Sequence, residues 1–272
     1  MKAWGLAPLW LRRLHQHRIL LWRLTQREVV GRYRGSLLGW GWSLLNPLLM
    51  LAVYTFVFST VFKARWPDLE QAGPLGFAIN LFAGLIVFNL AAECVGKAPT
   101  LVLSEPSYVT KVVFPLEVLS AVAVGAAGFH ACTSLVVLGL FEWMAVGAIP
   151  VTALWLPLVW LPLVLGCLGV CWLLSALGVF LRDLPQVVSV GLSMLMFLSA
   201  IFYPLSALPE RWQPWLRVNP LVPVIEQTRR VLVRGEQPEI LFVLLGVPLA
   251  LLGCELGFRL FLKARRGFAD VM

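Results

Sequence analysis

The chain is poor in charged residues. Only 13% of its 272 residues are Asp, Glu, Lys or Arg, whereas 60% are hydrophobic. Soluble domains carry roughly 25% charged residues. No soluble core of this length could bury so much apolar side chain. The composition therefore excludes an ordinary soluble protein and predicts that lipid surrounds most of the chain.

The sequence motifs of common catalytic sites are also absent. Gly96-Lys97 is the nearest approach to a Walker A phosphate-binding loop, but position 91 is Ala91 and no Ser or Thr follows the lysine. The sequence has no Gly-x-Ser-x-Gly elbow and no His-Glu-x-x-His helix. We therefore predict that the chain is not an enzyme and does not itself bind ATP.

Ionisable groups within the apolar segments are few. Glu93, Glu117 and Glu255 lie at the edges of these segments, and His130 lies well inside one. A proton-coupled carrier usually places ionisable groups at mid-membrane. We interpret His130 as a hydrogen-bonded residue at a helix contact, and we disfavour a secondary carrier.

The five cysteines form no recognisable metal site. They are scattered through apolar segments, and only Cys167 and Cys171 lie one helical turn apart. Two thiols do not complete a zinc site, so packing in helices is their expected role. The sequence predicts no metal ion and no cofactor.

Six long apolar segments are present, and they predict an all-α integral membrane protein with six transmembrane helices. The first carries no charge over about 27 residues, and at about 1.5 Å per residue such a helix crosses a hydrocarbon layer of about 30 Å. Pro150, Pro157 and Pro162 are expected to break or kink the first half of the fourth segment. The six segments are Ser36–Phe62, Leu75–Val95, Val118–Phe141, Val151–Leu181, Val187–Tyr203 and Leu241–Leu262.

The net charge of +8 is concentrated at the two ends of the chain. Lys and Arg next to a span resist translocation, so basic ends favour two cytoplasmic termini and an even number of crossings. Such clusters also attract anionic lipid head groups, which explains the charge without nucleic acid. The basic residues are Lys2, Arg12, Arg13, Arg18, Arg23, Arg27, Arg32 and Arg34 at one end, and Arg259, Lys263, Arg265 and Arg266 at the other.

Residues 1–272 are predicted to form a single transmembrane domain, with the six spans within residues 36–262. Residues 1–35 carry apolar side chains at roughly helical spacing and predict an amphipathic helix in the inner membrane interface. Prolines divide residues 204–239 into pieces too short to cross a membrane, so we expect re-entrant helices on the outer side. Residues 263–272 would form a cytoplasmic tail.

Four motifs follow one another along the chain. The first runs from Arg32-Tyr33-Arg34-Gly35-Ser36-Leu37-Leu38-Gly39-Trp40 to Asn46-Pro47-Leu48. The others are Val109–Glu117, Phe180–Leu184, and Asn219–Leu221 followed by Arg229-Arg230. Together they resemble the membrane subunit of bacterial ABC-2 type transporters that export O-antigen, capsular polysaccharide or teichoic acid.

The resemblance implies a homodimer in the bacterial inner membrane, served by two copies of a separate cytoplasmic ATPase subunit that binds the ATP. The implied cargo is a glycan on an undecaprenyl carrier, which moves outward through a channel between the subunits. The inner loop at residues 96–115 would dock on the ATPase as a coupling helix, aided by the turn after the fourth span. The candidates for this contact are Glu105, Pro106, Tyr108, Lys111, Arg182 and Asp183.

A path for polysaccharide needs aromatic rings that stack on the apolar faces of sugars. The first and fifth spans carry such rings, although packing or lipid contact is the simpler explanation for each ring taken singly. The segment before the sixth span would form an outer gate. The candidate path residues are Tyr33, Trp40, Trp42, Tyr54, Phe58, Phe197, Phe202 and Tyr203. The candidate gate residues are Asn219, Pro220, Arg229 and Arg230.

Two other functions remain open from the sequence. An ABC-2 subunit of related fold would export a drug or a lipid instead of a glycan. A membrane enzyme acting on lipid-linked sugars is the second alternative. Such an enzyme should place a histidine or an acidic pair against a cavity, and the sequence makes no such pair evident.

Overall fold

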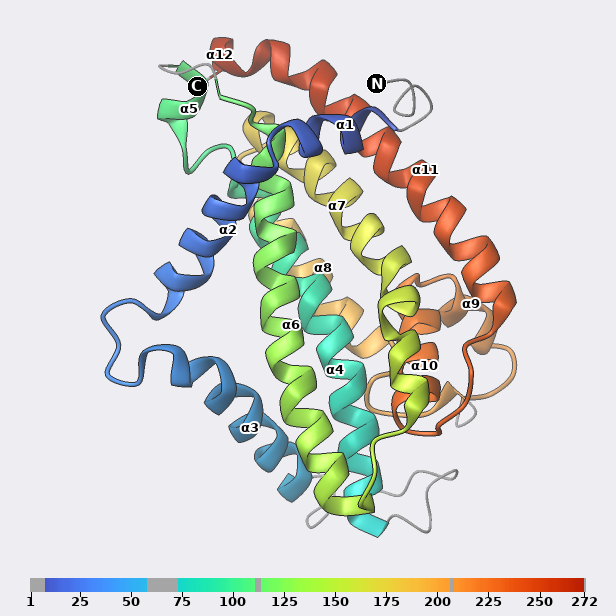
Figure 1. The fold of residues 1–272 in the computed structure, drawn as a ribbon. Helices are drawn as coiled ribbons and strands as arrows, with labels where there is room; N and C mark the ends of the chain where they lie inside the picture. Colours follow the sequence, from blue (N-terminus) through green and yellow to red (C-terminus); the bar gives the residue numbers. More distant parts are fainter. Residues whose placement is uncertain (1–7, 58–72, 111–113, 206–207, 272) are drawn as a thin grey trace.

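The computed structural model describes residues 8–57, 73–110, 114–205 and 208–271, and within these ranges the regular elements are all helical (Figure 1). Phe58 and Lys111 of the candidate sets lie outside the described residues. The α-helices are α1 (Leu9–Gln16), α2 (Arg18–Tyr33), α3 (Trp42–Tyr54), α4 (Gly73–Lys97), α5 (Pro106–Thr110), α6 (Glu117–Val146), α7 (Leu156–Phe180), α8 (Leu184–Leu198), α9 (Gln213–Arg217), α10 (Leu221–Leu232), α11 (Ile240–Ala264) and α12 (Phe268–Val271). Short 3-10 turns cover Gly39–Gly41, Ala98–Thr100, Val151–Trp155 and Arg265–Gly267.

Five helical stretches in the described part of the chain are long and apolar enough to cross a membrane. They correspond to five of the predicted spans, and the protein is an all-α integral membrane protein. The stretches are Gly39–Val57, Gly76–Thr100, Glu117–Ala145, Val151–Phe180 and Ile240–Gly267.

Helix α8 takes the place of the predicted fifth span, but it is shorter than the segment Val187–Tyr203 suggested. Its 15 residues are apolar and cover about 22 Å at about 1.5 Å per residue. The helix ends at Ser199 because the chain turns there, with Ala200 in the left-handed region at φ 51°. Six crossings therefore remain a prediction, with α8 as the shortest of them.

Helices α4, α6, α7, α10 and α11 form a closely packed bundle, here called the packed half. Its core contains Trp172, whose ring meets that of Phe258 edge to face at 4.7 Å. Helices α7 and α11 approach closely where glycines face each other. A Cβ atom added at Gly169 would lie 2.8 Å from the carbonyl oxygen of Gly253, so only glycine permits this approach.

Of the three prolines expected to break or kink the fourth segment, only Pro150 stands at a change of structure, and α7 runs unbroken past Pro157 and Pro162. A 3-10 turn at Val151–Trp155 follows Pro150, and α7 then begins with Pro157 in its first turn. A proline costs little there, because the first backbone N–H groups of a helix have no partner within the helix. Pro162 is accommodated inside α7.

The N-terminal region forms two helices rather than one. Helix α1 ends at His17, and α2 then runs away from α1 along α6 (Figure 1). Trp10 anchors α1 by packing its ring against Trp172 at 6.3 Å. Helices α1 and α12 lie at the same end of the bundle, here called the terminal end, and the opposite end is called the distal end.

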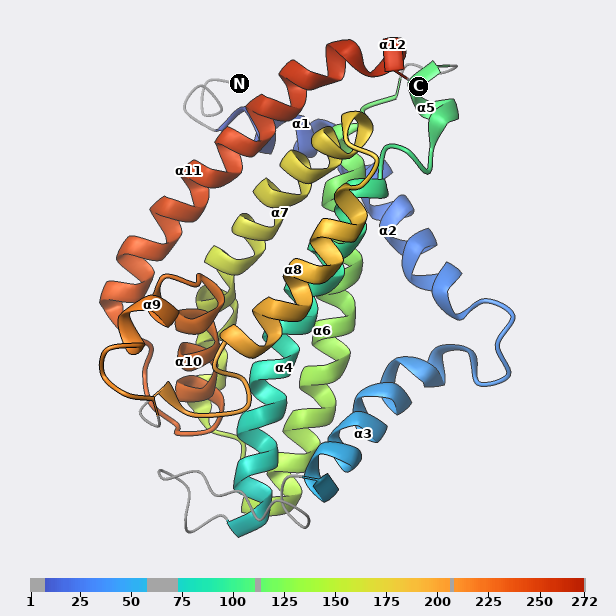
Figure 2. The same cartoon turned by 180° about the vertical axis from the view of Figure 1, so that it is seen from behind.

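Helices α2 and α3 form an arm at the side of the bundle, residues 18–57. Both views show α2 leaving the terminal end, the chain turning away from the bundle, and α3 returning to it at the distal end (Figures 1 and 2). The segment predicted to span from Ser36 to Phe62 is therefore helical only from Gly39, and it is described as far as Val57.

Residues 204–239 contain two short helices, as the prolines suggested. Helix α9 has five residues, and α10 has twelve. Helix α10 packs against α4 and α7 and buries most of its length. Its outward charges pair locally, with Arg230 bound to Glu236 and Glu239.

Candidate functional site

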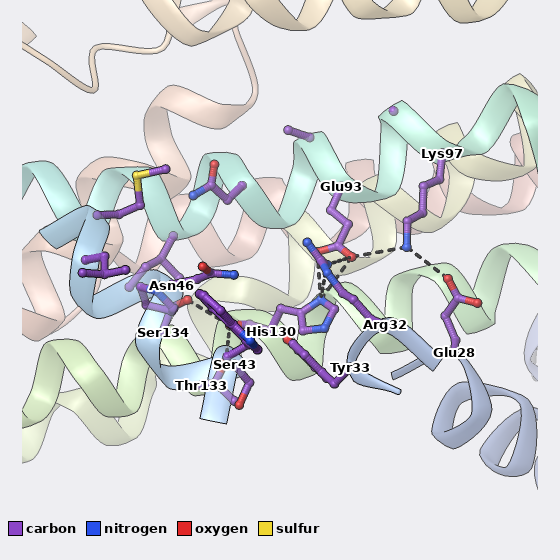
Figure 3. A pocket seen from close by; sticks show the side chains of 18 of the residues that line it. Glu28, Arg32, Tyr33, Ser43, Asn46, Glu93, Lys97, His130, Thr133 and Ser134 are labelled. Carbon is purple, nitrogen blue, oxygen red and sulfur yellow. Dashed lines mark hydrogen bonds and ion pairs between the residues drawn. The ribbon is translucent and has the colours of Figure 1, made fainter. Parts of the chain in front are cut away.

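A large cavity lies between the α2–α3 arm and helices α4 and α6. It has a volume of about 1240 Å³ and is open to the outside (Figure 3). Ligand pockets usually enclose about 300–1,000 Å³, so this space is ample for a molecule larger than a typical cofactor. We call it the lateral cavity.

One wall of the lateral cavity carries a cluster of charged side chains. Glu93 of α4 accepts a hydrogen bond of 2.8 Å from Arg32 Nη1 and lies 3.4 Å from Lys97 Nζ. Lys97 also binds Glu28 of α2 at 3.0 Å. His130 of α6 places its Nδ1 atom 2.9 Å from Glu93 Oε2. The cluster thus joins α2, α4 and α6, as Figure 3 shows.

One member of this cluster, His130, was interpreted correctly from the sequence. His130 is a hydrogen-bonded residue at a helix contact, in agreement with its interpretation, and its ring also meets Tyr33 edge to face at 6.0 Å. From the sequence alone, Glu93 is only an acid at the edge of a span. Its pairing with His130 depends on the packing of α4 on α6, which the sequence does not reveal.

The aromatic candidates of the arm gather near this cluster. Tyr33 is buried and lies 6.3 Å from Trp40, and burial raises the pKa of the Tyr33 hydroxyl, so the group stays neutral. Trp40 is half-exposed and meets Phe129 edge to face at 5.6 Å. Trp42 lines the lateral cavity, whereas Tyr54 packs against the core.

The aromatic candidates of the predicted fifth span form a second, separate group at the end of α8 and in the turn that follows it. Phe197 lies 5.7 Å from Phe202 between ring centres, and the Tyr203 hydroxyl donates a 2.8 Å hydrogen bond to the Phe197 carbonyl oxygen. A single chain thus presents two groups on different elements. A shared path along both remains a prediction that requires a second subunit.

The coupling candidates lie at the terminal end of the bundle. Arg27 of α2 lies 3.8 Å from Glu105 and 3.5 Å from the Tyr108 hydroxyl, and the Tyr108 contact raises the pKa of Arg27. Tyr108 stacks on Phe114 at 4.2 Å. Pro106 begins α5 and is exposed, and the turn that carries Arg182 and Asp183 is also exposed.

A buried carboxylate holds the loop that carries α5. Glu117 is fully buried at the start of α6, where it binds Arg13 of α1 at 3.2 Å and Arg265 at 2.9 Å. Arg265 also donates to the Phe114 carbonyl oxygen at 3.0 Å. This Glu117 cluster joins both ends of the chain to the coupling loop. In the sequence, Glu117 is the last residue of the motif Val109–Glu117, and its role as a shared ion-pair partner was not predicted.

The candidate gate residues Arg229 and Asn219 make hydrogen bonds that hold helices together towards the distal end. Arg229 is fully buried and donates to the carbonyl oxygens of Asn80, Ala200 and Ile201 at 3.1, 3.0 and 2.8 Å. Asn219 donates to the Leu198 carbonyl oxygen at 3.1 Å, and its side-chain oxygen accepts from the Leu221 N–H at 3.0 Å, ahead of α10. These residues fix α10 to α4 and to the end of α8.

The position before α10 is occupied by Pro220, with φ −65° and ψ −17°. Its ring fixes φ close to the helical value, so it suits the start of α10. Pro220 and Asn219 together therefore define where α10 begins.

The fold and these polar clusters define a multi-pass helical membrane protein whose charged side chains mainly join helices to one another. The sequence matches the ABC-2 type transporter membrane family over residues 19–233. The chain therefore belongs to the ABC-2 type transporter family.

Several relatives have names that specify their cargo. The O-antigen export system permease protein RfbA of Myxococcus xanthus is 32% identical over 84% of this chain and 86% of its own. A protein of the same name from Klebsiella pneumoniae is 26% identical over 93% of this chain and 95% of the relative's length. The polysialic acid transport protein KpsM of Escherichia coli is 25% identical over 78% of this chain and 80% of the relative's length.

Proposed function

We propose that the chain is the channel-forming subunit of an ATP-driven exporter that moves lipid-linked polysaccharide across the bacterial inner membrane. The observation that carries this proposal is the similarity to O-antigen export permeases over most of both chains. O-antigen, capsule and teichoic acid polymers are the cargo class, and an undecaprenyl lipid carries the glycan.

The active unit in this proposal is a homodimer. Helix α8 packs half-buried residues of one face against α4 and leaves an apolar stripe exposed on the other, with residues spaced three or four apart. Helix α3 is likewise largely exposed. Two copies related by a two-fold axis would bury the same surface on each, and this favours a channel between the subunits. The exposed residues of α8 include Val187, Val190, Met194 and Phe197.

Two copies of a cytoplasmic ATPase would dock at the terminal end and supply the ATP-binding site. The short exposed helix α5 and the Arg182–Asp183 turn would form the contact. Arg27 and the Glu117 cluster connect α5 to α2, α6 and the end of α11. A movement imposed on α5 would thus reach both the arm and the packed half, which is the requirement for coupling.

A lipid-linked sugar enzyme is less well supported, although Glu93 and His130 do face a cavity as that alternative required. Arg32 and Lys97 bind the same carboxylate, so Glu93 is held as the centre of an ion-pair cluster. A carboxylate held in this way is a weak general base. The similarity to transport permeases also favours export.

The test is co-purification of the chain with a candidate ABC ATPase subunit, followed by ATPase measurements with and without lipid-linked glycan. We expect association and stimulation by the glycan. Reversing both charges of the exposed turn, by Arg182→Glu with Asp183→Lys, should abolish association. Arg211→Glu, an exposed charge reversal far from α5, is the matched control and should leave it intact. An ATPase that never associates, or that a drug or simple lipid stimulates instead of glycan, contradicts the proposal.

A further inference from the structure

Two walls of the lateral cavity, formed by α3 and α4, change from polar to apolar in the same direction. On α3 the change runs from Ser43 and Asn46 to Met50. The lining residues of α4 recur three or four apart, so they share one face of that helix. The order on α4, from the terminal towards the distal end, is Lys97, Glu93, Asn89, Ile86 and Phe82. Charged groups, then amides, then hydrocarbon is also the order along a membrane lipid.

The charged end of the cavity carries both signs. Glu28 and Arg32 lie one turn apart on α2, so their side chains are neighbours. Each binds a residue of α4 rather than the other, with Glu28 3.0 Å from Lys97 and Arg32 2.8 Å from Glu93 (Figure 3). The remaining charged residue of this wall, Arg27, is paired with a carboxylate outside it. The charged end therefore suits a head group that itself carries both signs.

Glu28 and Arg32 both keep hydrogen-bonding capacity to spare. Within the described residues, Glu28 accepts through Oε1 alone, and Arg32 donates through Nη1 alone. The Oε2 atom of Glu28 and the Nη2 and Nε atoms of Arg32 are not engaged. The two side chains are 47% and 50% exposed. A carboxylate and a guanidinium side by side can thus take an ammonium and a phosphate of one ligand.

Two amide side chains follow the charged end. Asn46 of α3 and Asn89 of α4 line the cavity and are exposed, and neither makes a side-chain hydrogen bond within the described part of the chain. An amide that faces hydrocarbon without a partner is unfavourable. Each amide can donate to a carbonyl oxygen. A glycerophospholipid carries two ester carbonyl groups between its head group and its chains, whereas an isoprenoid lipid has none there.

We propose that the lateral cavity binds a glycerophospholipid of the surrounding membrane that has a phosphoethanolamine head group. Arg32 holds the phosphate, because its planar donors pair with two phosphate oxygens at once. Glu28 accepts hydrogen bonds from the ammonium, and Asn46 and Asn89 donate to the ester carbonyls. The acyl chains lie along the apolar part beside α3. Such a lipid contacts α2, α3 and α4 together, so it joins the arm to the packed half.

Binding is measured by native mass spectrometry of the purified full chain in detergent, with dioleoyl lipids added one at a time. We expect one phosphatidylethanolamine per chain, bound at least about tenfold more tightly than phosphatidylcholine or phosphatidylglycerol. The choline head group keeps the phosphate but cannot donate a hydrogen bond to Glu28, and the glycerol head group has no cation. An ether-linked phosphatidylethanolamine lacks the carbonyl groups and should bind about tenfold more weakly than the ester-linked lipid.

The decisive variant is Glu28→Gln, which keeps the shape of the side chain and removes its charge. The preference for phosphatidylethanolamine over phosphatidylcholine should fall to within about twofold. Arg32→Gln should instead weaken both lipids by about tenfold, because both contain the phosphate. The matched control is Glu255→Gln, which changes a carboxylate of α11 that is bound to Arg259 outside the cavity. It should keep the preference of the parent chain.

The amides are tested by Asn89→Leu, which keeps the side-chain volume close to the original. The preference for the ester-linked over the ether-linked lipid should decrease at least about threefold. Each variant is judged by the ratio of two affinities measured on the same preparation, so a fraction of misfolded chain does not change the result.

Three outcomes overturn the site. They are equal affinity of the parent chain for phosphatidylethanolamine and phosphatidylcholine, an unchanged preference in Glu28→Gln, and equal affinity for the ester-linked and ether-linked lipids. Tighter binding of phosphatidylglycerol than of phosphatidylethanolamine overturns it as well. The lipid is not a cargo, so the site does not rest on the proposed function. A chain that selects phosphatidylethanolamine but never associates with an ATPase loses only the proposed function.

Discussion

The packed half and the α2–α3 arm each contain an arginine that joins several helices, and the two arginines differ sharply. Arg229 in the packed half is fully buried and donates to three backbone carbonyl oxygens. Arg32 in the arm is half-exposed and shares one carboxylate with His130 and Lys97. The carbonyl partners of Arg229 are fixed in the backbone, whereas the partners of Arg32 are side chains that can exchange for a ligand.

The same difference appears in the packing. Where α7 and α11 meet, glycines bring the backbones into contact, so neither helix can shift without losing close packing. Beside the arm there is instead a cavity of about 1240 Å³. We conclude that the packed half contributes more to the stability of the fold than the arm does. Substitutions of matched kind in the two regions test this conclusion.

The largest effect is expected at the contact between α7 and α11. Gly169→Ala places a methyl group 2.8 Å from the Gly253 carbonyl oxygen and 2.9 Å from the Cys254 Cα atom. Backbone atoms cannot rotate away, so the helices must separate, at a cost of about 3 kcal/mol. Thermal unfolding in detergent measures the loss. Gly166→Ala on the same helix meets nothing within 4 Å and should be neutral or stabilising; equal effects would disprove the close contact.

The second effect concerns the buried arginine of the packed half. Arg229→Gln leaves the carbonyl oxygens of Ala200 and Ile201 without their donors and removes one of the two arginines paired with Glu226. Removing one member of a buried charge network costs about 3 kcal/mol. Denaturant unfolding should show this loss. Arg230→Gln, one residue away and partly exposed, should cost less than about 1 kcal/mol. A comparable loss in both variants would contradict the role assigned to Arg229.

A smaller effect is expected at the Glu117 cluster. Glu117→Gln keeps the shape of the side chain but leaves Arg13 and Arg265 without their shared negative charge, at a cost of about 2 kcal/mol. Both ends of the chain should then be cleaved faster in limited proteolysis. Glu105→Gln removes a partly exposed partner of Arg27 and serves as the control. Unchanged cleavage at both ends of the Glu117 variant would show that the cluster does not hold them.

The smallest effect on stability is expected in the arm. Arg32→Gln removes a half-exposed partner of Glu93, and His130 and Lys97 remain bound to that carboxylate. The unfolding free energy should therefore change by less than about 1 kcal/mol. Unfolding under the conditions used for Arg229→Gln gives the direct comparison. A loss as large as that of Arg229→Gln would mean that the arm belongs to the rigid part of the fold.

The sequence predicts the spans well, because a long uncharged run has few alternatives in lipid. The ends of α6, α7 and α11 lie within about five residues of the predicted segments. The turn at Ala200 was not predicted, because alanine rarely adopts the left-handed conformation that this residue has. Glu93 and His130 carry the charged cluster, yet 37 residues separate them, and only the packing of α4 on α6 brings them together.

The Glu117 cluster has a consequence for the synthesis of the protein. Arg13 and Glu117 are synthesised before Arg265, which is added only when the chain is almost complete. Until α11 has been inserted, one oxygen of Glu117 lacks its second arginine and the coupling loop lacks the bond from Arg265 to Phe114. A chain truncated before α11 therefore lacks both contacts that tie the loop before α6 to the C-terminal end.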